Sequence, residues 1–145
     1  MRTGFLGAGH IARALAEGWR RDAPQTSSGI ILSVYDPLPE SAASFAAQFD
    51  AQACASPAAL ANLSELVVLA MRPTDVPAAL SALAPILEAR ALVSLAAAVP
   101  LDELRAGLPD GACVARLMPN VAAAVAGRVV KVWSPPEAMP SALDA

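Results

Sequence analysis

The chain has 145 residues, of which 56% are hydrophobic and 16% charged, and this suits one folded domain with a single core. Its formal net charge of −3 comes without a cluster of lysines and arginines, so the composition argues against a nucleic-acid partner. The longest apolar runs, such as 91–99, are too short to cross a bilayer, and no secretory signal opens the sequence. We therefore expect a cytoplasmic protein without a membrane partner.

The first predicted unit is a strand, a glycine turn and a helix. Residues 3–6 form a short apolar run that ends in Gly7, and apolar residues then recur at helical spacing from Ile11 to Trp19. The charged residues of this helix fall on the opposite face, which we expect solvent to cover: Arg13, Glu17, Arg20 and Arg21. The helix thus has one side suited to packing on a sheet.

Strands and helices continue to alternate along the rest of the chain. Further strands are expected at residues 30–35, 52–54, 66–70, 91–96, 113–117 and 127–133. Further helices are expected at residues 39–49, 57–63, about 75–83 and 101–108. Ser56 and Thr74 stand where a side chain can cap the helix that follows. The alternation predicts an α/β, Rossmann-type doubly wound fold, with a mostly parallel sheet and helices on both faces.

The first turn carries the pattern of a dinucleotide site. The run Gly7-Ala8-Gly9-His10-Ile11-Ala12 follows a strand and opens a helix, as a dinucleotide-binding fingerprint requires. Gly7 allows a tight turn, Gly9 lets the backbone approach a pyrophosphate, and Ala12 is small enough for helix–strand packing. Phosphates would lie among the free N–H groups of a helix N-terminus. The alternative is a glycine turn without a ligand.

Asp36 ends the second strand, where a carboxylate can accept hydrogen bonds from ribose hydroxyls and repel a 2′-phosphate. Because residues 37–39 offer no arginine or lysine to that phosphate, the sequence favours NAD over NADP. The alternative is that Asp36 only forms a solvated turn before a proline. His10 is the single histidine, and we expect a turn or capping role for it. No metal-ligand set is apparent, so no metal is predicted.

Two further features lie outside this pattern. Cys54 and Cys113 lack the spacing of a zinc or redox site, and we expect free buried thiols without a chemical role. Residues 134–145 break the last strand and begin another helical pattern, within which the sequence stops. We therefore expect a dinucleotide-binding domain at residues 1–133, and the start of a connection to an absent C-terminal domain at 134–145.

Four blocks of sequence resemble the pyrroline-5-carboxylate reductase family, which reduces a cyclic imine to proline with NADPH or NADH. The blocks are residues 4–11, 67–73, 92–97 and 116–120. The resemblance implies an oxidoreductase of proline and amino-acid biosynthesis, and Asn120 as the polar group at the nicotinamide and the imine. Cofactor contacts are expected from Gly7, Ala8, Gly9, His10, Ile11, Asp36, Ala70, Met71, Arg72, Pro73, Ala96, Met118 and Pro119. The family forms homo-oligomers through a C-terminal helical domain, which also supplies a hydroxyl for the substrate carboxylate.

The departures from the family pattern lie near the reaction end. Val121-Ala122 stand where the family usually has Thr-Pro, and Ala98 and Ala126 replace glycines. Other readings therefore stay open, including a relative that acts on another imine and a non-catalytic nucleotide-binding or regulatory domain. A deazaflavin-dependent NADP reductase is a further alternative, against which the segment 118–120 argues.

Overall fold

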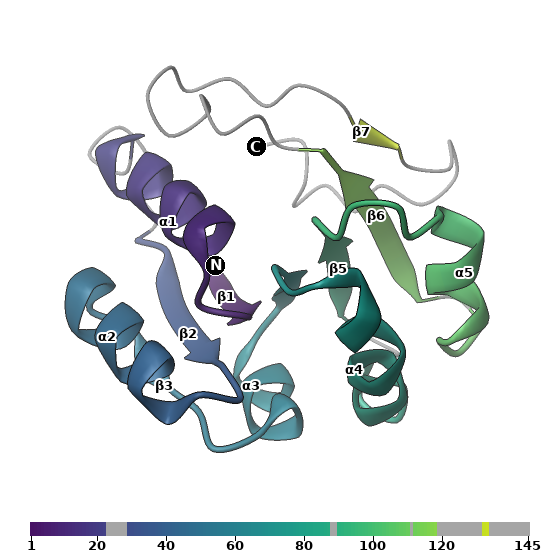
Figure 1. Ribbon diagram of the computed structural model, residues 1–145, viewed down its shortest axis with the longest axis horizontal. Helices are drawn as coiled ribbons and strands as arrows, with labels where there is room; N and C mark the ends of the chain where they lie inside the picture. Colours follow the sequence, from purple (N-terminus) through teal and green to yellow (C-terminus); the bar gives the residue numbers. More distant parts are fainter. Residues whose placement is uncertain (23–28, 88–89, 111, 119–131, 134–145) are drawn as a thin grey trace.

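The computed structural model describes residues 1–22, 29–87, 90–110, 112–118 and 132–133 (Figure 1). The strands are β1 (Arg2–Leu6), β2 (Ile31–Tyr35), β3 (Gln52–Ala53), β4 (Leu66–Leu69), β5 (Ala91–Ser94), β6 (Cys113–Leu117) and β7 (Val132–Trp133). The helices are α1 (His10–Asp22), α2 (Pro39–Phe49), α3 (Pro57–Leu63), α4 (Val76–Leu83) and α5 (Leu101–Ala106), with a 3₁₀ turn, η2, at Pro73–Asp75. The predicted elements are thus confirmed with small changes at their ends, except that residues 127–131 lie outside the described part.

The strands form one sheet in the order β3-β2-β1-β4-β5-β6-β7. Strands β1 to β6 are parallel and β7 pairs antiparallel with β6, so the mostly parallel sheet is confirmed. From β1 the chain proceeds outward to β2 and β3, and then crosses back to β4 on the other side of β1. The order therefore reverses between β1 and β4, and in open α/β sheets such a switch point is where ligands bind.

Helices cover both faces of the sheet (Figure 1). On one face Phe5 of β1 packs with α1 and α2, in a cluster that includes Ala12, Ala16 and Phe45. On the other face Leu6 packs with α3, α4 and α5. Successive residues of β1 thus enter opposite cores. Burial on both faces also explains why the neighbouring strand β4 is apolar at every position.

Of the two predicted side-chain caps, the one on α3 is present and the one on α4 is not. Ser56 caps α3 as predicted, since its Oγ accepts a hydrogen bond from the Ala59 N–H at 3.1 Å. The expectation that Thr74 caps α4 is wrong. The η2 turn leads directly into α4, whose N-cap is Asp75 in helical conformation, and the Thr74 hydroxyl donates to the Asp75 carboxylate at 3.4 Å.

The charged face of α1 is only partly solvated. Glu17 and Arg21 form an exposed pair at 4.0 Å, as a solvated face predicts. The same expectation is wrong for Arg13, which is half-buried, and Arg20 is exposed but donates to the Gln48 carbonyl at 2.6 Å. The reason is that α2 packs alongside α1, so that this side of the helix faces a neighbour.

Both cysteines are thiols outside any disulfide, as predicted, but they are half-buried and not fully buried. Burial raises the pKa of both the Cys54 and the Cys113 thiol above the usual value. A raised pKa lowers the thiolate fraction at neutral pH and hence the reactivity.

In the described part of the chain, no helix is both long and apolar enough to cross a membrane.

Candidate functional site

The glycine turn after β1 is shaped by the strands beside it. Gly7 has φ 104°, and its N–H donates to the Tyr35 carbonyl at 2.8 Å. A Cβ at this position would overlap the backbone carbonyl of Ala70. Both the conformation and the contact therefore require glycine at position 7.

Gly9 meets a different environment in the same turn. A Cβ built on Gly9 would have no heavy atom within 4 Å, and its φ is not positive. The fold itself therefore does not need glycine here, whereas close approach of a ligand to the backbone does. The open space is where the fingerprint expects a pyrophosphate.

Helix α1 presents free N–H groups beside this space. Its first hydrogen bond runs from the Arg13 N–H to the Gly9 carbonyl at 3.1 Å. The N–H groups of His10, Ile11 and Ala12 precede that bond and belong to the unsatisfied donors of a helix N-terminus. Together with the positive end of the helix dipole, these donors suit an anionic group.

The carboxylate of Asp36 contacts the backbone on two sides. Its Oδ2 accepts a hydrogen bond from the Ala8 N–H at 2.9 Å, and its Oδ1 accepts one from the Leu38 N–H at 2.9 Å. Asp36 is thus a turn former, as the alternative reading held, but it also holds the glycine turn. A carboxylate has about four lone-pair sites, so capacity remains for ribose hydroxyls.

The loop after β4 borders the glycine turn. The Ala70 N–H donates to the Leu6 carbonyl at 2.8 Å, which holds the start of the loop against the end of β1. Met71 is half-buried, whereas Arg72 and Pro73 are exposed. The Arg72 Nε donates to the Asp75 carboxylate at 3.0 Å, and its side chain is 82% exposed. The cation of Arg72 therefore stands at the surface beside the turn.

The remaining candidates follow β5 and β6. Ala96 is buried, and its N–H donates to the Ser94 hydroxyl at 3.3 Å. Met118 is exposed, and the Arg116 guanidinium lies 3.4 Å from its sulfur. Pro119 and Asn120 lie outside the described residues, as do Val121, Ala122 and Ala126.

Ala98, which stands where the related family has glycine, adopts φ 61°. This is the left-handed region that glycine occupies without cost and that alanine occupies at about 1–2 kcal/mol. The departure from the family pattern therefore leaves the backbone conformation of a glycine in place. It falls in the loop after β5.

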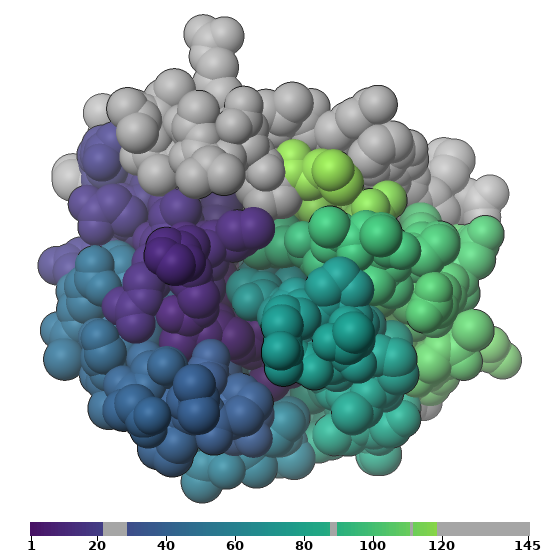
Figure 2. All heavy atoms as spheres, in the orientation of Figure 1, coloured from purple at the N-terminus to yellow at the C-terminus, as the bar shows by residue number. Residues whose placement is uncertain are grey.

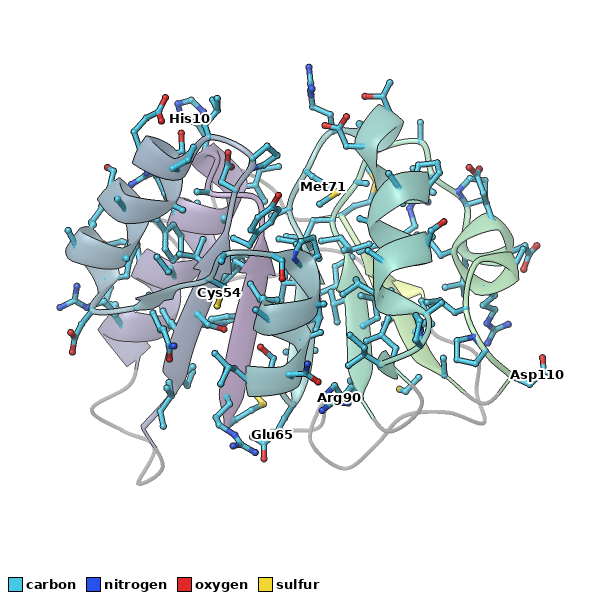
Figure 3. All side chains as sticks on the ribbon, turned by 90° about the horizontal axis from the view of Figure 1, so that it is seen from below. His10, Cys54, Glu65, Met71, Arg90 and Asp110 are labelled. Atoms are coloured by element: carbon cyan, nitrogen blue, oxygen red, sulfur yellow. The ribbon has the colours of Figure 1, made fainter. Side chains whose placement is uncertain are left out.

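The described candidates share one edge of the sheet. The register pairs Leu6 with Tyr35 and with Leu69, and Leu69 with Ser94, so the carboxyl ends of these strands are level. Figure 3 shows His10 and Met71 at this edge, with Glu65, Arg90 and Asp110 at the opposite edge. Figure 2 views the same edge, whose surface is hollowed between the purple N-terminal segment and the teal segment. The structure thus brings the glycine turn, Asp36 and the loop after β4 together at the switch point.

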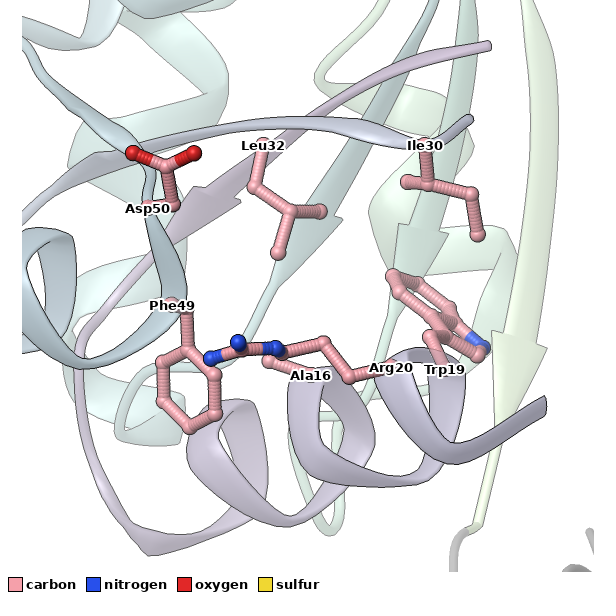
Figure 4. Close-up of a pocket in the computed structure, with 7 residues that line it drawn as sticks. All are labelled: Ala16, Trp19, Arg20, Ile30, Leu32, Phe49 and Asp50. Atoms are coloured by element: carbon pink, nitrogen blue, oxygen red, sulfur yellow. The ribbon is translucent and has the colours of Figure 1, made fainter. Parts of the chain in front are cut away.

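A separate pocket of about 210 Å³ lies at the other end of α1 (Figure 4). Its lining residues come from the ends of α1 and α2 and from the start of β2: Ala16, Trp19, Arg20, Ile30, Leu32, Phe49 and Asp50. None of the predicted site residues is among them. We assign this pocket no role in the candidate site.

Comparison with known families agrees with this geometry. Residues 2–98 match the family model described as "NADP oxidoreductase coenzyme F420-dependent". The chain belongs to this family. The matched region contains the glycine turn, Asp36 and the loop after β4, and so most of the candidate site. Coenzyme F420 is a deazaflavin, so this description corresponds to the alternative of a deazaflavin-dependent NADP reductase.

The curated relatives are named pyrroline-5-carboxylate reductases. The chain is 32% identical over 126 residues to pyrroline-5-carboxylate reductase of Methanosarcina acetivorans and 34% identical over 123 residues to that of Pseudomonas aeruginosa. These matches cover 86% and 84% of the chain but only 46% and 44% of the relatives. The chain thus spans less than half the length of these curated relatives. The predicted resemblance to the N-terminal domain of this reductase is confirmed.

Solved structures agree with the fold. The pyrroline carboxylate reductase of Plasmodium falciparum with NADP bound has a TM-score of 0.79 at 21% identity, covering 98% of this chain and 50% of that one. The pyrroline-5-carboxylate reductase of Coxiella burnetii has a TM-score of 0.83 at 19% identity, with coverage of 98% and 52%. At these identities the likeness supports the Rossmann-type fold and nothing finer.

Sequence reasoning missed two contacts of the site. The bond from the Ala8 N–H to Asp36 joins residues 28 positions apart, and no local pattern announces it. The pattern of charges in the sequence predicts a solvated Arg13, although its position one helical turn after Gly9 places it beside the glycine turn. The spacing of one helical turn between Gly9 and Arg13 is the sequence feature that could have predicted this contact.

Proposed function

We propose that this chain is the dinucleotide-binding part of an NAD(P)H-dependent imine reductase that converts 1-pyrroline-5-carboxylate, or a close cyclic imine, to proline or its analogue. The observation that carries the proposal is the convergence at the switch point of an open Gly9, free N–H groups at the start of α1, and the Asp36 carboxylate. The names of the curated relatives support the reaction. With this reaction we also propose a role in proline biosynthesis and a cytoplasmic location.

The residues at this edge fit a nicotinamide dinucleotide. The N–H groups of the first turn of α1 would hold the pyrophosphate, and the remaining lone pairs of Asp36 would accept from the adenosine ribose hydroxyls. Arg72 and Met71 would border the cofactor from the loop after β4. The bound cofactor supplies the hydride, so the protein needs to supply position and field.

We assign the chain a preference for NAD(H) over NADP(H). Asp36 points a carboxylate into the turn and would oppose an extra phosphate on the ribose. The nearby exposed cation of the described site, Arg72, is engaged by Asp75. NADH and NADPH titrations of the 145-residue chain test the preference, and tighter NADPH binding would overturn the role given to Asp36.

The reacting end of the site would be built from the segment after β6. Met118, Pro119 and Asn120 would lie by the nicotinamide, with Asn120 as the polar group toward the imine. This segment would form one side of the substrate site. We expect the C-terminal domain of a full-length protein to complete the substrate site and to form the homo-oligomer.

The reaction is tested with a cofactor-oxidation assay on pyrroline-5-carboxylate. The 145-residue chain should show no measurable turnover, because misplacement of the imine by about an ångström can cost on the order of a hundredfold in rate. A full-length parent should turn over, and Asn120→Ala in that parent should depress turnover more than NADH binding. An active isolated chain would refute the incomplete site, and an inactive parent that binds NADH would favour a non-catalytic binding domain.

A further inference from the structure

Arg13 joins the glycine turn to helix α2. Its Nε donates to the Ala8 carbonyl at 3.0 Å, and one terminal nitrogen donates to the Gln48 side-chain oxygen at 2.6 Å. The other terminal nitrogen lies 3.4 Å from two oxygens of α2. The guanidinium carbon is 5.7 Å from the centre of the Phe45 ring, within the range of a cation–π contact. The side chain is therefore held in one place on several sides.

The peptide groups of Ala8 are bonded from two elements. The N–H donates to Asp36 at the end of β2, and the carbonyl accepts from Arg13 of α1. Ala8 itself is only 3% exposed. The first backbone hydrogen bond of α1 goes to the Gly9 carbonyl, one residue after Ala8. The Ala8 carbonyl therefore lies outside the helical bonds, and the Arg13 side chain satisfies it. Both polar groups of the central turn residue are thus fixed before any ligand arrives.

We infer that Arg13 is a positioning residue of the cofactor site, which orients the Gly7–Gly9 turn through the Ala8 carbonyl. The inference rests on the proposed function. Rotation of the Ala8 and Gly9 peptides would redirect the N–H groups that face the phosphates. A turn that is already fixed spares the ligand the cost of ordering it, which is the benefit of preorganisation.

The role depends on the shape of arginine as well as its charge. Arg13 uses its Nε toward the turn and its terminal nitrogens toward α2, and only the planar five-donor fork can serve both directions together. Lysine retains the positive charge but offers a single ammonium. Arg13→Lys therefore separates the geometry of the side chain from its charge.

The test compares Arg13→Gln and Arg13→Lys with Arg20→Gln. Arg20 is a matched control because it lies on the same helix, loses the same charge and also bonds to α2, through the Gln48 carbonyl at 2.6 Å. NADH titration of the 145-residue chain, at a temperature where all variants are folded, should give a dissociation constant raised about tenfold in both Arg13 variants, a change of about 1.4 kcal/mol. Arg20→Gln should stay within about twofold of the wild type, since a screened exposed charge contributes little.

A readout without ligand separates this inference from the proposed function. Amide NMR spectra of the unliganded chain should show shifted or broadened Ala8 and Gly9 resonances in Arg13→Gln and unchanged ones in Arg20→Gln. If the wild type binds NADH and the Arg13 variants bind it equally well, the positioning role is overturned and the proposed function stands. If Arg13→Lys binds NADH as tightly as the wild type while Arg13→Gln does not, the loss of affinity comes from the lost charge, and the positioning role is overturned. Equal losses of NADH affinity in Arg13→Gln and Arg20→Gln would lead to the same conclusion. A wild type that binds no dinucleotide would overturn both.

Discussion

Replacement of Gly9 by valine should remove dinucleotide binding while the fold persists. A Cβ at Gly9 meets no heavy atom within 4 Å, so the protein has room for the new side chain. Because valine is a poorer residue than glycine just before a helix, we expect a loss of up to about 1 kcal/mol in the free energy of unfolding. The valine would occupy the space of the pyrophosphate, and NADH affinity should fall at least about a hundredfold, which is about 2.7 kcal/mol.

Gly7→Ala is the matched comparison within the same turn. Gly7 has φ 104°, and its Cβ would overlap the Ala70 carbonyl, a backbone atom that cannot rotate away. We expect destabilisation of roughly 2–4 kcal/mol from the conformation and the overlap together. Calorimetric titration with NADH, alongside thermal unfolding, distinguishes the two variants: Gly9→Val folded and non-binding, Gly7→Ala poorly folded. A folded Gly9→Val protein with unchanged NADH affinity would refute the assignment of the turn.

Three other changes test separate parts of the argument. Ala98→Gly should raise the free energy of unfolding by about 0.5–1 kcal/mol, because it relieves a left-handed alanine at φ 61° at the entropic cost of a glycine; an unchanged stability in urea unfolding would contradict the strain. Ser56→Ala should lower the stability by about 1 kcal/mol through loss of the bond to the Ala59 N–H, and an unaltered unfolding midpoint would count against the cap. Asp36→Ser should shift the ratio of NADPH to NADH affinity toward NADPH by about tenfold, or about 1.4 kcal/mol, and a constant ratio in paired titrations would show that the carboxylate does not select the cofactor.

Local patterns in the sequence were sufficient for the order of the elements. The periods of apolar residues predicted the helices and strands, since burial of one face requires that repeat. Ser56 before Pro57 predicted a cap that the structure confirms, because a cap acts within one helical turn. The same reasoning failed at Thr74, where the chain formed a 3₁₀ turn that needs no side-chain cap.

The dinucleotide-binding fingerprint could also be predicted, because a glycine turn between a strand and a helix depends only on residues that are neighbours in the sequence. Gly7 is required by its own φ and by contact with the loop after β4, and the sequence pattern identified it without knowledge of that contact. Asn120 and the division at residue 133 stay predictions, and so do the individual cofactor contacts.

Tertiary structure decided what depends on residues distant in the chain. The sequence by itself determined the class of fold and the place of the glycine turn, because these follow from local spacing and the backbone freedom of glycine. The strand order, and with it the switch point beside the turn, came from pairing of β1 with both β2 and β4. The inward role of Arg13 arose because α2 packs beside α1, and the bond from Ala8 to Asp36 arose because β1 and β2 end level. Such contacts are set by the three-dimensional proximity of elements, which the spacing of residues in one segment does not encode.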